Sequence, residues 1–268
     1  MVDLAPNNPY GLALRSRVMA AAGCFGYGVE YARLVEIERA GAIVTRSTTL
    51  RGRRVARPPQ LIETPAGLLA VGAWPDPGLA RVVERYAPQW AAWSTPVLLS
   101  IVGERPDEYA AIAAALEGVE GIAGLELHLA DHTSQAAQIV AAARAATLLP
   151  LIAKLPPASE GLAALARAVV GAGADAIALI ASPPGLAADP RGGGLVAGRL
   201  SGPALRPLAL AAVAAVVAAV DAPVIGCGGI ATAGDARQFL AAGAVAVQVG
   251  AALLADPAAL VRIAEELG

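Results

Sequence analysis

The amino-acid sequence predicts an α/β protein, a (β/α)8 TIM barrel with a small N-terminal hairpin. A unit recurs along the chain in which a short apolar strand precedes a longer Ala-rich amphipathic segment, with Gly, Pro or Asp at the joints. Each strand is nearly uniformly apolar, which is typical of parallel strands covered on both faces. Eight such units in 268 residues have the size of one barrel. No linker-like or low-complexity stretch divides the sequence, so we expect residues 1–268 to form a single domain.

The predicted elements follow in order along the chain. Residues 9–18, PYGLALRSRV, should form a hairpin that caps the bottom of the barrel. The segments between the strands are long enough for crossover helices. The longest apolar run, residues 207–220, is too short to span a bilayer and fits a buried helix face. The predicted strands are 18–23, 41–47, 95–102, 124–130, 149–155, 176–182, 222–229 and 244–250.

Composition and charge exclude several classes of partner. Charged residues make up 16% of the chain and the net charge is −2, which leaves no electrostatic footprint for nucleic acid or an anionic membrane. The N-terminus lacks the apolar segment of a secretory signal, so we expect a cytoplasmic protein. Cys24 and Cys227 lie far apart in sequence and indicate neither a disulfide framework nor a CxxC ligand pair. The expected partner is a small molecule.

A barrel of this type carries its chemistry at the carboxyl ends of its strands. Two glycine-rich turns, GCGGI at 226–230 and VGAAL at 249–253, follow the last two strands, where barrels bind phosphate through backbone N–H groups. A tight strand-to-helix connection would explain either turn alone, but the pair favours a phosphate site. The polar residues expected at the same end are Arg46, Ser47, Thr48, Thr49, Ser100, His128, Asp131, Lys154 and Ser182.

Lys154 lies inside an apolar strand, where a lysine is costly unless its ammonium group has a purpose. One interpretation is that the side chain extends to solvent at the rim of the barrel. The other is that it holds an anion or stabilises negative charge on a cofactor ring. The neighbouring glycine turns favour the second interpretation.

Motifs along nearly the whole chain resemble those of the dihydroorotate dehydrogenase family. They are AAAGCFGYGVEY, TRSTTL, ETPAGLL, DPGL, AKLPP, GRLSGPALRPLAL, PVIGCGGI and AVQVGAALL, in the order of the family. The resemblance implies an FMN-dependent barrel of the class 1 type that oxidises dihydroorotate to orotate in pyrimidine biosynthesis. It also implies a homodimer and, as in the related heteromeric enzymes, a separate electron-transfer subunit.

The resemblance further implies which residues contact the flavin. The backbone at 21–23 would meet the ring, and Lys154 matches the lysine that hydrogen-bonds its pyrimidine edge. Residues 201–202, 227–229 and 250–251 match segments that hold the ribityl chain and phosphate. The full implied set is Ala21, Ala22, Gly23, Arg46, Ser47, His128, Lys154, Ile180, Ser201, Gly202, Cys227, Gly228, Gly229, Gly250 and Ala251.

The substrate half of the implied site departs from the family pattern. The family binds planar, acidic orotate with several asparagines and one lysine, and Arg46 stands in place of that lysine. Each lost amide would leave polar substrate edges unpaired at a cost of about 1 to 3 kcal/mol. Dihydroorotate should therefore fit this pocket less well. The residues that replace asparagines are Ala70, Asp76, Ser100, His128, Thr133 and Ala181.

Asp131 falls on the cysteine that serves the family as the base for the C5 proton, because LELHLADHT aligns with LELNxSCPN. A carboxylate whose pKa is raised in an apolar mouth can act as that base. Equally, Asp131 or Thr133 can cap the following helix, which leaves His132 facing solvent. A metal site would require His128, Asp131 and His132 to converge, which a strand end and a turn rarely achieve, so no metal is predicted.

Three hypotheses for function follow. The first is an FMN oxidoreductase that acts as a dihydroorotate dehydrogenase. The second is an FMN-binding relative with a different substrate or without dehydrogenase activity, which the missing asparagines favour. The third is a flavin-free phosphosugar isomerase or aldolase-like barrel that uses Lys154 with Asp131.

Overall fold

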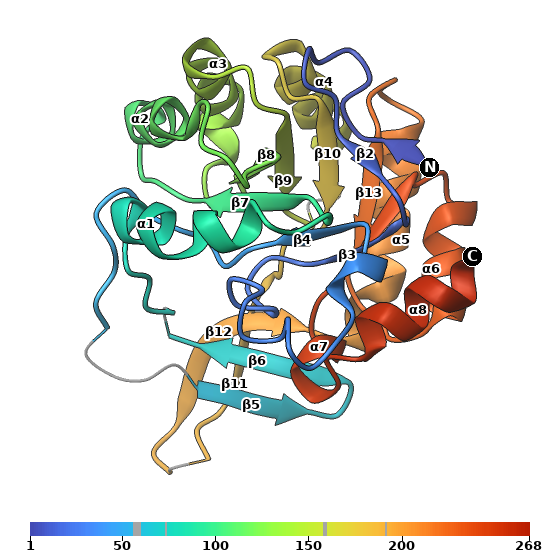
Figure 1. The fold of residues 1–268 in the computed structure, drawn as a ribbon. Coiled ribbons are helices and arrows are strands. Elements are labelled where there is room, and N and C mark those ends of the chain that lie inside the picture. Colours follow the sequence, from blue (N-terminus) through green and yellow to red (C-terminus); the bar gives the residue numbers. More distant parts are fainter. Residues whose placement is uncertain (56–59, 73, 158–159, 191) are drawn as a thin grey trace.

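Eight parallel strands close into a barrel in the computed structural model, which describes residues 1–55, 60–72, 74–157, 160–190 and 192–268 (Figure 1). Every predicted strand is confirmed, and each is shorter than predicted because the flanking Gly, Pro and polar residues leave the hydrogen-bonded ladder. The barrel strands are β3 (Val18–Ala20), β4 (Ala42–Val44), β7 (Val97–Ile101), β8 (Gly124–His128), β9 (Leu151–Leu155), β10 (Ala176–Leu179), β13 (Val224–Cys227) and β14 (Ala246–Val249).

Helices cover the outside of the barrel, and apolar side chains fill the layer between helices and strands. The apolar run 207–220 forms most of α5 with its buried residues on one face, as predicted. The helices are α1 (Leu79–Trp90), α2 (Pro106–Leu116), α3 (Ala136–Ala146), α4 (Leu162–Gly171), α5 (Arg206–Val217), α6 (Ala233–Ala241), α7 (Ala252–Ala255) and α8 (Ala259–Leu267), with the 3-10 turns η1 (Ile37–Arg39), η2 (Thr133–Gln135) and η3 (Pro203–Leu205).

The first crossover departs from the repeat, because β3 and β4 are joined by a loop whose only regular element in the described chain is η1. Gly23, Gly26 and Gly28 all have positive φ in this loop. Such backbone conformations end a helix, and glycine adopts them without steric cost. The prediction of a crossover helix is therefore wrong at this one connection.

The N-terminal segment closes the bottom of the barrel. β1 (Val2–Asp3) pairs with β2 (Ala13–Leu14) in a small antiparallel sheet. The predicted hairpin is thus present, although its first strand lies ahead of residues 9–18. Leu4, Leu12 and Leu14 belong to the same buried cluster as the barrel interior. The barrel is therefore closed at the amino ends of its strands and open at their carboxyl ends.

A four-stranded antiparallel sheet stands beyond this open end, which we call the mouth, and the sequence did not predict it. Its order is β11 (Pro184–Ala188), β12 (Leu195–Ser201), β6 (Gly67–Val71) and β5 (Gln60–Thr64). β5 and β6 follow barrel strand β4, whereas β11 and β12 follow β10. Two excursions from different strands thus pair over the mouth, and side chains on β12 and β6 can reach the loops below.

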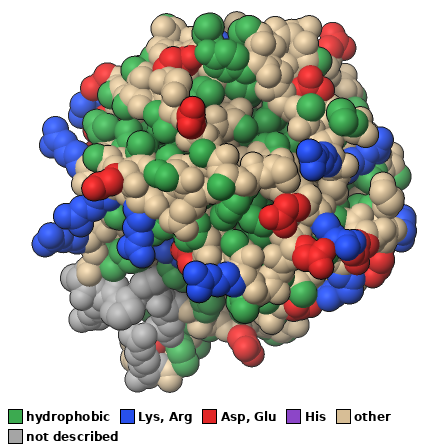
Figure 2. All heavy atoms as spheres, in the orientation of Figure 1, with side chains coloured by type: hydrophobic (Ala, Val, Ile, Leu, Met, Phe, Trp, Pro, Cys, Tyr) green, Lys and Arg blue, Asp and Glu red, His purple; other side chains and the backbone are tan. Residues whose placement is uncertain are grey.

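Figure 2 shows Lys and Arg side chains grouped along the lower left edge of this face, whereas acidic and basic side chains are mixed on its right side. Of the helices in the described part of the chain, none has both the length and the apolar character that crossing a membrane requires.

Candidate active site

A buried hydrogen-bonded chain of three side chains crosses the barrel just below its mouth. The Lys154 ammonium donates to Gln248 Oε1 over 2.5 Å, and Gln248 Nε2 donates to Glu126 Oε2 over 2.6 Å. All three side chains are buried, and they come from β9, β14 and β8. Lys154 therefore does not extend to solvent, which excludes the first interpretation of this residue.

The charge on Lys154 is stabilised from two sides. Burial acts to lower its pKa, but the nearby Cys227 sulfur and Glu126 carboxylate outweigh burial, so the pKa is raised above its ordinary value. A charged, buried ammonium at the mouth can pair with negative charge on a bound ligand. A free amine nucleophile would need the opposite shift.

Two buried polar atoms at the mouth have no hydrogen-bond partner among the described residues. They are Arg46 Nε and Glu126 Oε1. The Arg46 guanidinium carbon lies 5.0 Å from the centroid of the Trp74 ring, so the cation stacks on an indole. Buried polar groups are almost always paired in native proteins, so these two atoms mark the mouth as a place for a polar ligand.

The glycine turn after β13 brings three backbone segments together. A Cβ at Gly229, which has φ +72°, would lie 2.8 Å from Arg206 N and 2.9 Å from Gly202 O. A Cβ at Gly202 would lie 2.5 Å from Gly67 Cα. No other residue fits such positions, and the result is a side-chain-free cradle beside the start of η3 and α5. That this turn binds phosphate stays a prediction; an anion held by backbone N–H groups requires a place free of side chains, as this one is.

The residues predicted to hold a flavin come together around this mouth. Lys154 lies one residue before the end of β9, and each of the others ends or follows a barrel strand or β12 on the open side of the barrel. A Cβ on Gly250 would lie 3.5 Å from Ala21 Cβ, and one on Gly228 would lie 3.3 Å from Ile180 Cγ1. The residues that follow β3 and β14 thus approach each other, as do those that follow β10 and β13. Whether these residues hold a cofactor stays a prediction, but the buried Lys154, the unpaired Arg46 Nε and the glycine cradle fit FMN.

The two cysteines also meet at the mouth, although they are 203 positions apart in sequence. Burial raises the pKa of Cys24 to about 12, with a further contribution from Cys227. Both thiols are free. Cys24 therefore stays a neutral thiol at physiological pH and is not a nucleophile.

His128, Asp131 and Arg199 form a network at the rim of the mouth. Arg199 Nη2 donates to Asp131 Oδ1, and Asp131 Oδ2 lies 3.6 Å from His128 Nε2. The neighbouring His128 and Arg199 hold the pKa of Asp131 well below its ordinary value, against the opposing effect of burial. The expectation that this carboxyl has a raised pKa is therefore wrong. That Asp131 is the catalytic base stays a prediction.

The alternative role for this loop, a helix cap, is also wrong. α3 begins almost at once after the strand, as predicted, but its N-cap residue is Gln135 and η2 has His132 at that position. Neither η2 nor α3 has a hydrogen bond from the side chain of its N-cap residue. His132 is half-buried. In the described residues, no group of three or more His, Cys, Asp or Glu side chains is arranged to hold a metal ion.

The residues that replace asparagines have separate structural explanations. Asp76 is buried and accepts hydrogen bonds from Thr49 N at 3.2 Å, Thr49 Oγ1 at 3.1 Å and Gly78 N at 3.0 Å. These bonds need only an acceptor, which a carboxylate supplies as well as an amide. Ser100 Oγ pairs with Ser47 Oγ at 2.9 Å. Asp76 and Ser100 thus both hydrogen-bond to residues of the loop that follows β4.

Ala70 lies directly opposite Arg199 in the pairing of β6 with β12. A small side chain at this position leaves room beside it for the long arginine. Ala181 is buried, and Thr133 is exposed. The lost amides at Ala70 and His128 are therefore accompanied by a new charged group, Arg199, in the same part of the mouth.

Sequence reasoning missed Arg199, Gln248 and Glu126. Gln248 interrupts an otherwise apolar strand, and Glu126 lies among apolar residues in the strand that ends at His128, the same kind of signal that identified Lys154. Arg199 carries no such signal, because its partner Asp131 is 68 residues away and the sheet that positions it was not predicted.

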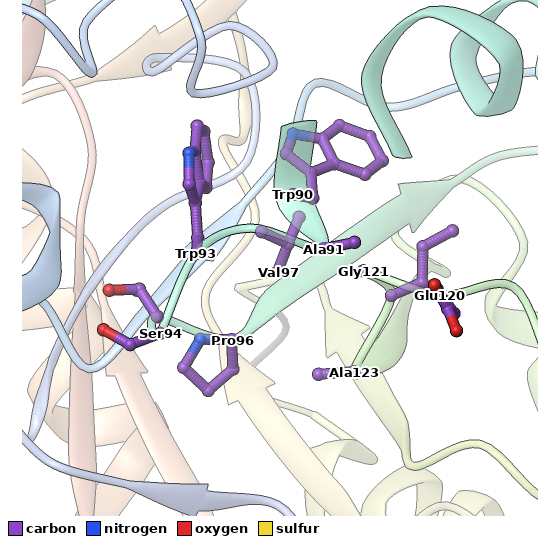
Figure 3. A pocket seen from close by; sticks show the side chains of 11 residues that line it. Trp90, Ala91, Trp93, Ser94, Pro96, Val97, Glu120, Gly121 and Ala123 are labelled. Atoms are coloured by element: carbon purple, nitrogen blue, oxygen red, sulfur yellow. The ribbon is translucent and has the colours of Figure 1, made fainter. Parts of the chain in front are cut away.

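A separate hollow of about 510 Å³ lies at the opposite end of the barrel from the mouth. It is lined by residues that precede β7 and β8, among them Trp90, Trp93, Ser94 and Glu120 (Figure 3). Since barrels of this type carry their chemistry at the carboxyl ends of the strands, we assign the site to the mouth and not to this hollow.

The chain is similar to known proteins along nearly its whole length. A family model described as dihydroorotate dehydrogenase matches residues 6–268. The chain is 40% identical over 273 residues to the dihydroorotate dehydrogenase B (NAD(+)) catalytic subunit of Desulforudis audaxviator, covering 96% of this chain and 89% of that protein. The subunits of the same name from Trichlorobacter lovleyi and Pelobacter propionicus are 40% and 39% identical, covering 95% and 96% of this chain and 89% and 90% of theirs. The chain belongs to the dihydroorotate dehydrogenase family.

Proposed function

We propose that this protein is the catalytic subunit of an FMN-dependent dihydroorotate dehydrogenase, which oxidises a CH–CH bond of dihydroorotate to give orotate in pyrimidine biosynthesis. The relatives named above are catalytic subunits of dihydroorotate dehydrogenase B. The observation that carries the proposal is the buried, charged Lys154 held by Gln248 beneath the mouth. A single domain over residues 1–268 is part of the proposal.

FMN supplies the two-electron acceptor for this oxidation when it is bound. Lys154 would face the pyrimidine edge of the ring, where its charge favours an anionic reduced state. The backbone at Gly228 and Gly229 and at Gly250 and Ala251 would hold the phosphate. Glycine is required at Gly229, because a Cβ there would collide with the neighbouring backbone. The rest of the implied cofactor set completes the mouth around the ring.

We propose two protein partners. The relatives are named as catalytic subunits of an NAD(+) enzyme, which implies a second subunit that passes electrons between the flavin and NAD. The resemblance of the chain to class 1 enzymes adds a homodimer. Co-purification with the electron-transfer subunit encoded by the same organism, followed by mass measurement of the complex, tests both.

An anaerobic visible spectrum, recorded before and after addition of dihydroorotate, tests the proposed activity. Flavin bands that bleach establish the reductive half-reaction. Flavin bands that persist at saturating dihydroorotate contradict the substrate assignment while leaving the cofactor assignment intact. A colourless protein that does not take up added FMN contradicts both.

A second candidate function is oxidation of a different planar acid by the same flavin site. The observation that favours it is the pair of alanines, Ala70 and Ala181, where the family has amides that hydrogen-bond orotate. Orotate titrated into the flavin-loaded protein distinguishes the candidates, because binding shifts the flavin spectrum. The flavin-free aldolase-like alternative is disfavoured, since Lys154 is hydrogen-bonded and its pKa is raised.

A further inference from the structure

We propose that His128 is the base that removes the substrate proton, and that Asp131 and Arg199 are positioning residues that orient its imidazole ring. The proposal rests on the proposed dehydrogenase function and deepens it. It concerns the network at the rim of the mouth, whose members come from β8, the following loop and β12.

His128 lies where a base must be. It is the last residue of β8, and its register partner on β9 is Lys154. Side chains two apart on a strand share a face, so His128 stands on the same inner face as Glu126, one step nearer the mouth. The backbone is held as well, because the His128 carbonyl accepts a 2.7 Å hydrogen bond from the Tyr109 hydroxyl. The side chain is 29% exposed, so a ligand at the mouth can reach it.

The two ring nitrogens have different surroundings. Nε2 faces Asp131 Oδ2 at 3.6 Å, whereas Nδ1 has no hydrogen-bond partner among the described residues. A carboxylate beside one nitrogen selects the tautomer that carries its proton there and leaves the lone pair on the other. Nδ1 is therefore the atom that accepts a proton from the substrate.

Asp131 is poorly suited to accept that proton itself. Its Oδ1 is paired with Arg199 and its Oδ2 is turned to His128. The guanidinium that pairs with it also approaches the Ser182 carbonyl at 3.5 Å, so the carboxylate is tied to the loop after β10. A base works best when its pKa lies near the operating pH, and the pKa of Asp131 is far below it.

The C–H bond next to the substrate carbonyl breaks, its proton passes to Nδ1 of His128, and the electron pair forms the new C=C bond. FMN, which the proposed function supplies, would be the two-electron oxidant and would accept the hydride, with its electron pair, from the adjacent carbon. Asp131 stabilises the imidazolium that results, while Lys154 faces the flavin. The charged or titratable groups around the imidazole are Asp131 of its loop, Arg199 of β12, Lys154 of β9, Tyr109 of α2 and Glu126 of its own strand.

The experiment uses the flavin-loaded protein and the fact that it contains only two histidines. Anaerobic rapid mixing with saturating dihydroorotate gives the rate of flavin bleaching across pH. His128→Gln should slow bleaching, measured per bound flavin, by about 10² to 10⁴-fold. His132→Gln is the matched control and should stay within about twofold of the wild type, because a residue outside the step contributes no base catalysis. His128→Asn, which restores the amide typical of the family, should be as slow as His128→Gln and guards against a folding defect.

The positioning residues have a signature of their own. Asp131→Asn should shift the midpoint of the pH–rate profile to lower pH, because a neutral amide no longer stabilises the imidazolium. Arg199→Gln should shift the midpoint to higher pH, since it frees the full charge of Asp131. Asp131→Glu should recover most of the wild-type profile. A merely structural role for these residues would lower the rate at all pH values and move no midpoint.

A second readout does not depend on turnover. Diethyl pyrocarbonate modifies accessible imidazoles, and peptide mass spectrometry separates His128 from His132. Saturating orotate should lower the rate of modification of His128 by about tenfold, which corresponds to a 1.4 kcal/mol preference for the covered state. The rate of modification of His132 should not change. Equal modification with and without orotate overturns the contact.

The outcomes separate the two proposals. Wild-type protein that bleaches while His128→Gln bleaches at the full rate overturns the assignment of His128 and leaves the dehydrogenase function standing. Loss of bleaching in Asp131→Asn together with full activity in His128→Gln would make Asp131 the base. Wild-type flavin that does not bleach overturns the dehydrogenase function and the base assignment with it.

Discussion

Removing the positive charge of Lys154 should destabilise the fold through Glu126, which would keep a buried carboxylate without a cation. Lys154→Met preserves the length and apolar packing of the side chain but deletes the donor to Gln248. The buried Glu126 Oε1 already lacks a partner, so the carboxylate has no other way to compensate. Protonation is then the least costly response.

The magnitude follows from that response. Protonating an ordinary glutamate of pKa about 4.3 at pH 7 costs about 1.36 kcal/mol for each of about 2.7 pH units, or about 3.7 kcal/mol. At pH 5 the same cost is about 1 kcal/mol. The free energy of unfolding of Lys154→Met should therefore fall by up to about 3.7 kcal/mol at pH 7, and most of this loss should disappear as the pH is lowered to 5.

Urea unfolding followed by far-UV circular dichroism measures the effect. The double variant Glu126→Gln/Lys154→Met is the matched control, because it lacks both charges and shares any loss of flavin affinity. It should be more stable than Lys154→Met at pH 7 and nearly insensitive to pH over this range. Equal unfolding free energies for the single and double variants at pH 7 would refute the reasoning.

Three further predictions follow from the site. Lys154→Met should purify with a lower ratio of FMN to protein than the wild type, measured by the flavin absorbance of the denatured protein, because the ammonium at the mouth no longer faces the ring; an unchanged ratio would remove Lys154 from the flavin contacts. Gly229→Ala should reduce FMN content and stability, since its Cβ would lie 2.8 Å from Arg206 N, whereas Gly192→Ala, also at positive φ but with nothing within 4 Å, should keep FMN bound. Asp131→Asn should lower the free energy of unfolding by up to about 1 kcal/mol at pH 7, because the Arg199 pair is partly exposed to solvent. Because the pKa of Asp131 is lowered in the folded state, this contribution is fully present above the unfolded-state pKa of about 3.9 and is lost progressively as the pH falls from there through the lower folded-state pKa, so the difference between wild type and variant should begin to shrink below about pH 4 in unfolding experiments.

The barrel could be predicted from the sequence because its signal is local. Uninterrupted apolar runs such as 95–102 and 149–155 have few alternatives to buried parallel strands. The sheet over the mouth has no comparable signal. Residues 184–201 are rich in Gly and Pro, and Leu186 and Leu195 are exposed, so the stretch has the composition of a loop. Its strands form because β12 pairs with β6, which is far away in sequence.

The candidate site, like the fold, could be predicted from the sequence only where its signal is local. Lys154 and the glycine turns could be found because a buried charge and paired glycines are unusual wherever they occur. The state of Asp131 could not be found, because it depends on the reach of Arg199 from the unpredicted sheet. An isolated carboxyl in an apolar mouth would have a raised pKa, and the neighbouring His128 together with the Arg199 cation reverses the direction.

The N-terminal segment that closes the barrel has a consequence for how the chain tolerates change at its start. Leu4, Leu12 and Leu14 are fully or almost fully buried, and Asn8 Nδ2 donates to Asp175 Oδ2 at 3.3 Å, at the edge of the floor. Met1, by contrast, is 98% exposed. A purification tag or fusion partner joined ahead of Met1 should leave the molecule undisturbed. Deleting the first fourteen residues would instead expose Met19 and Ile152 to water, and the closed end of the barrel would become open to solvent.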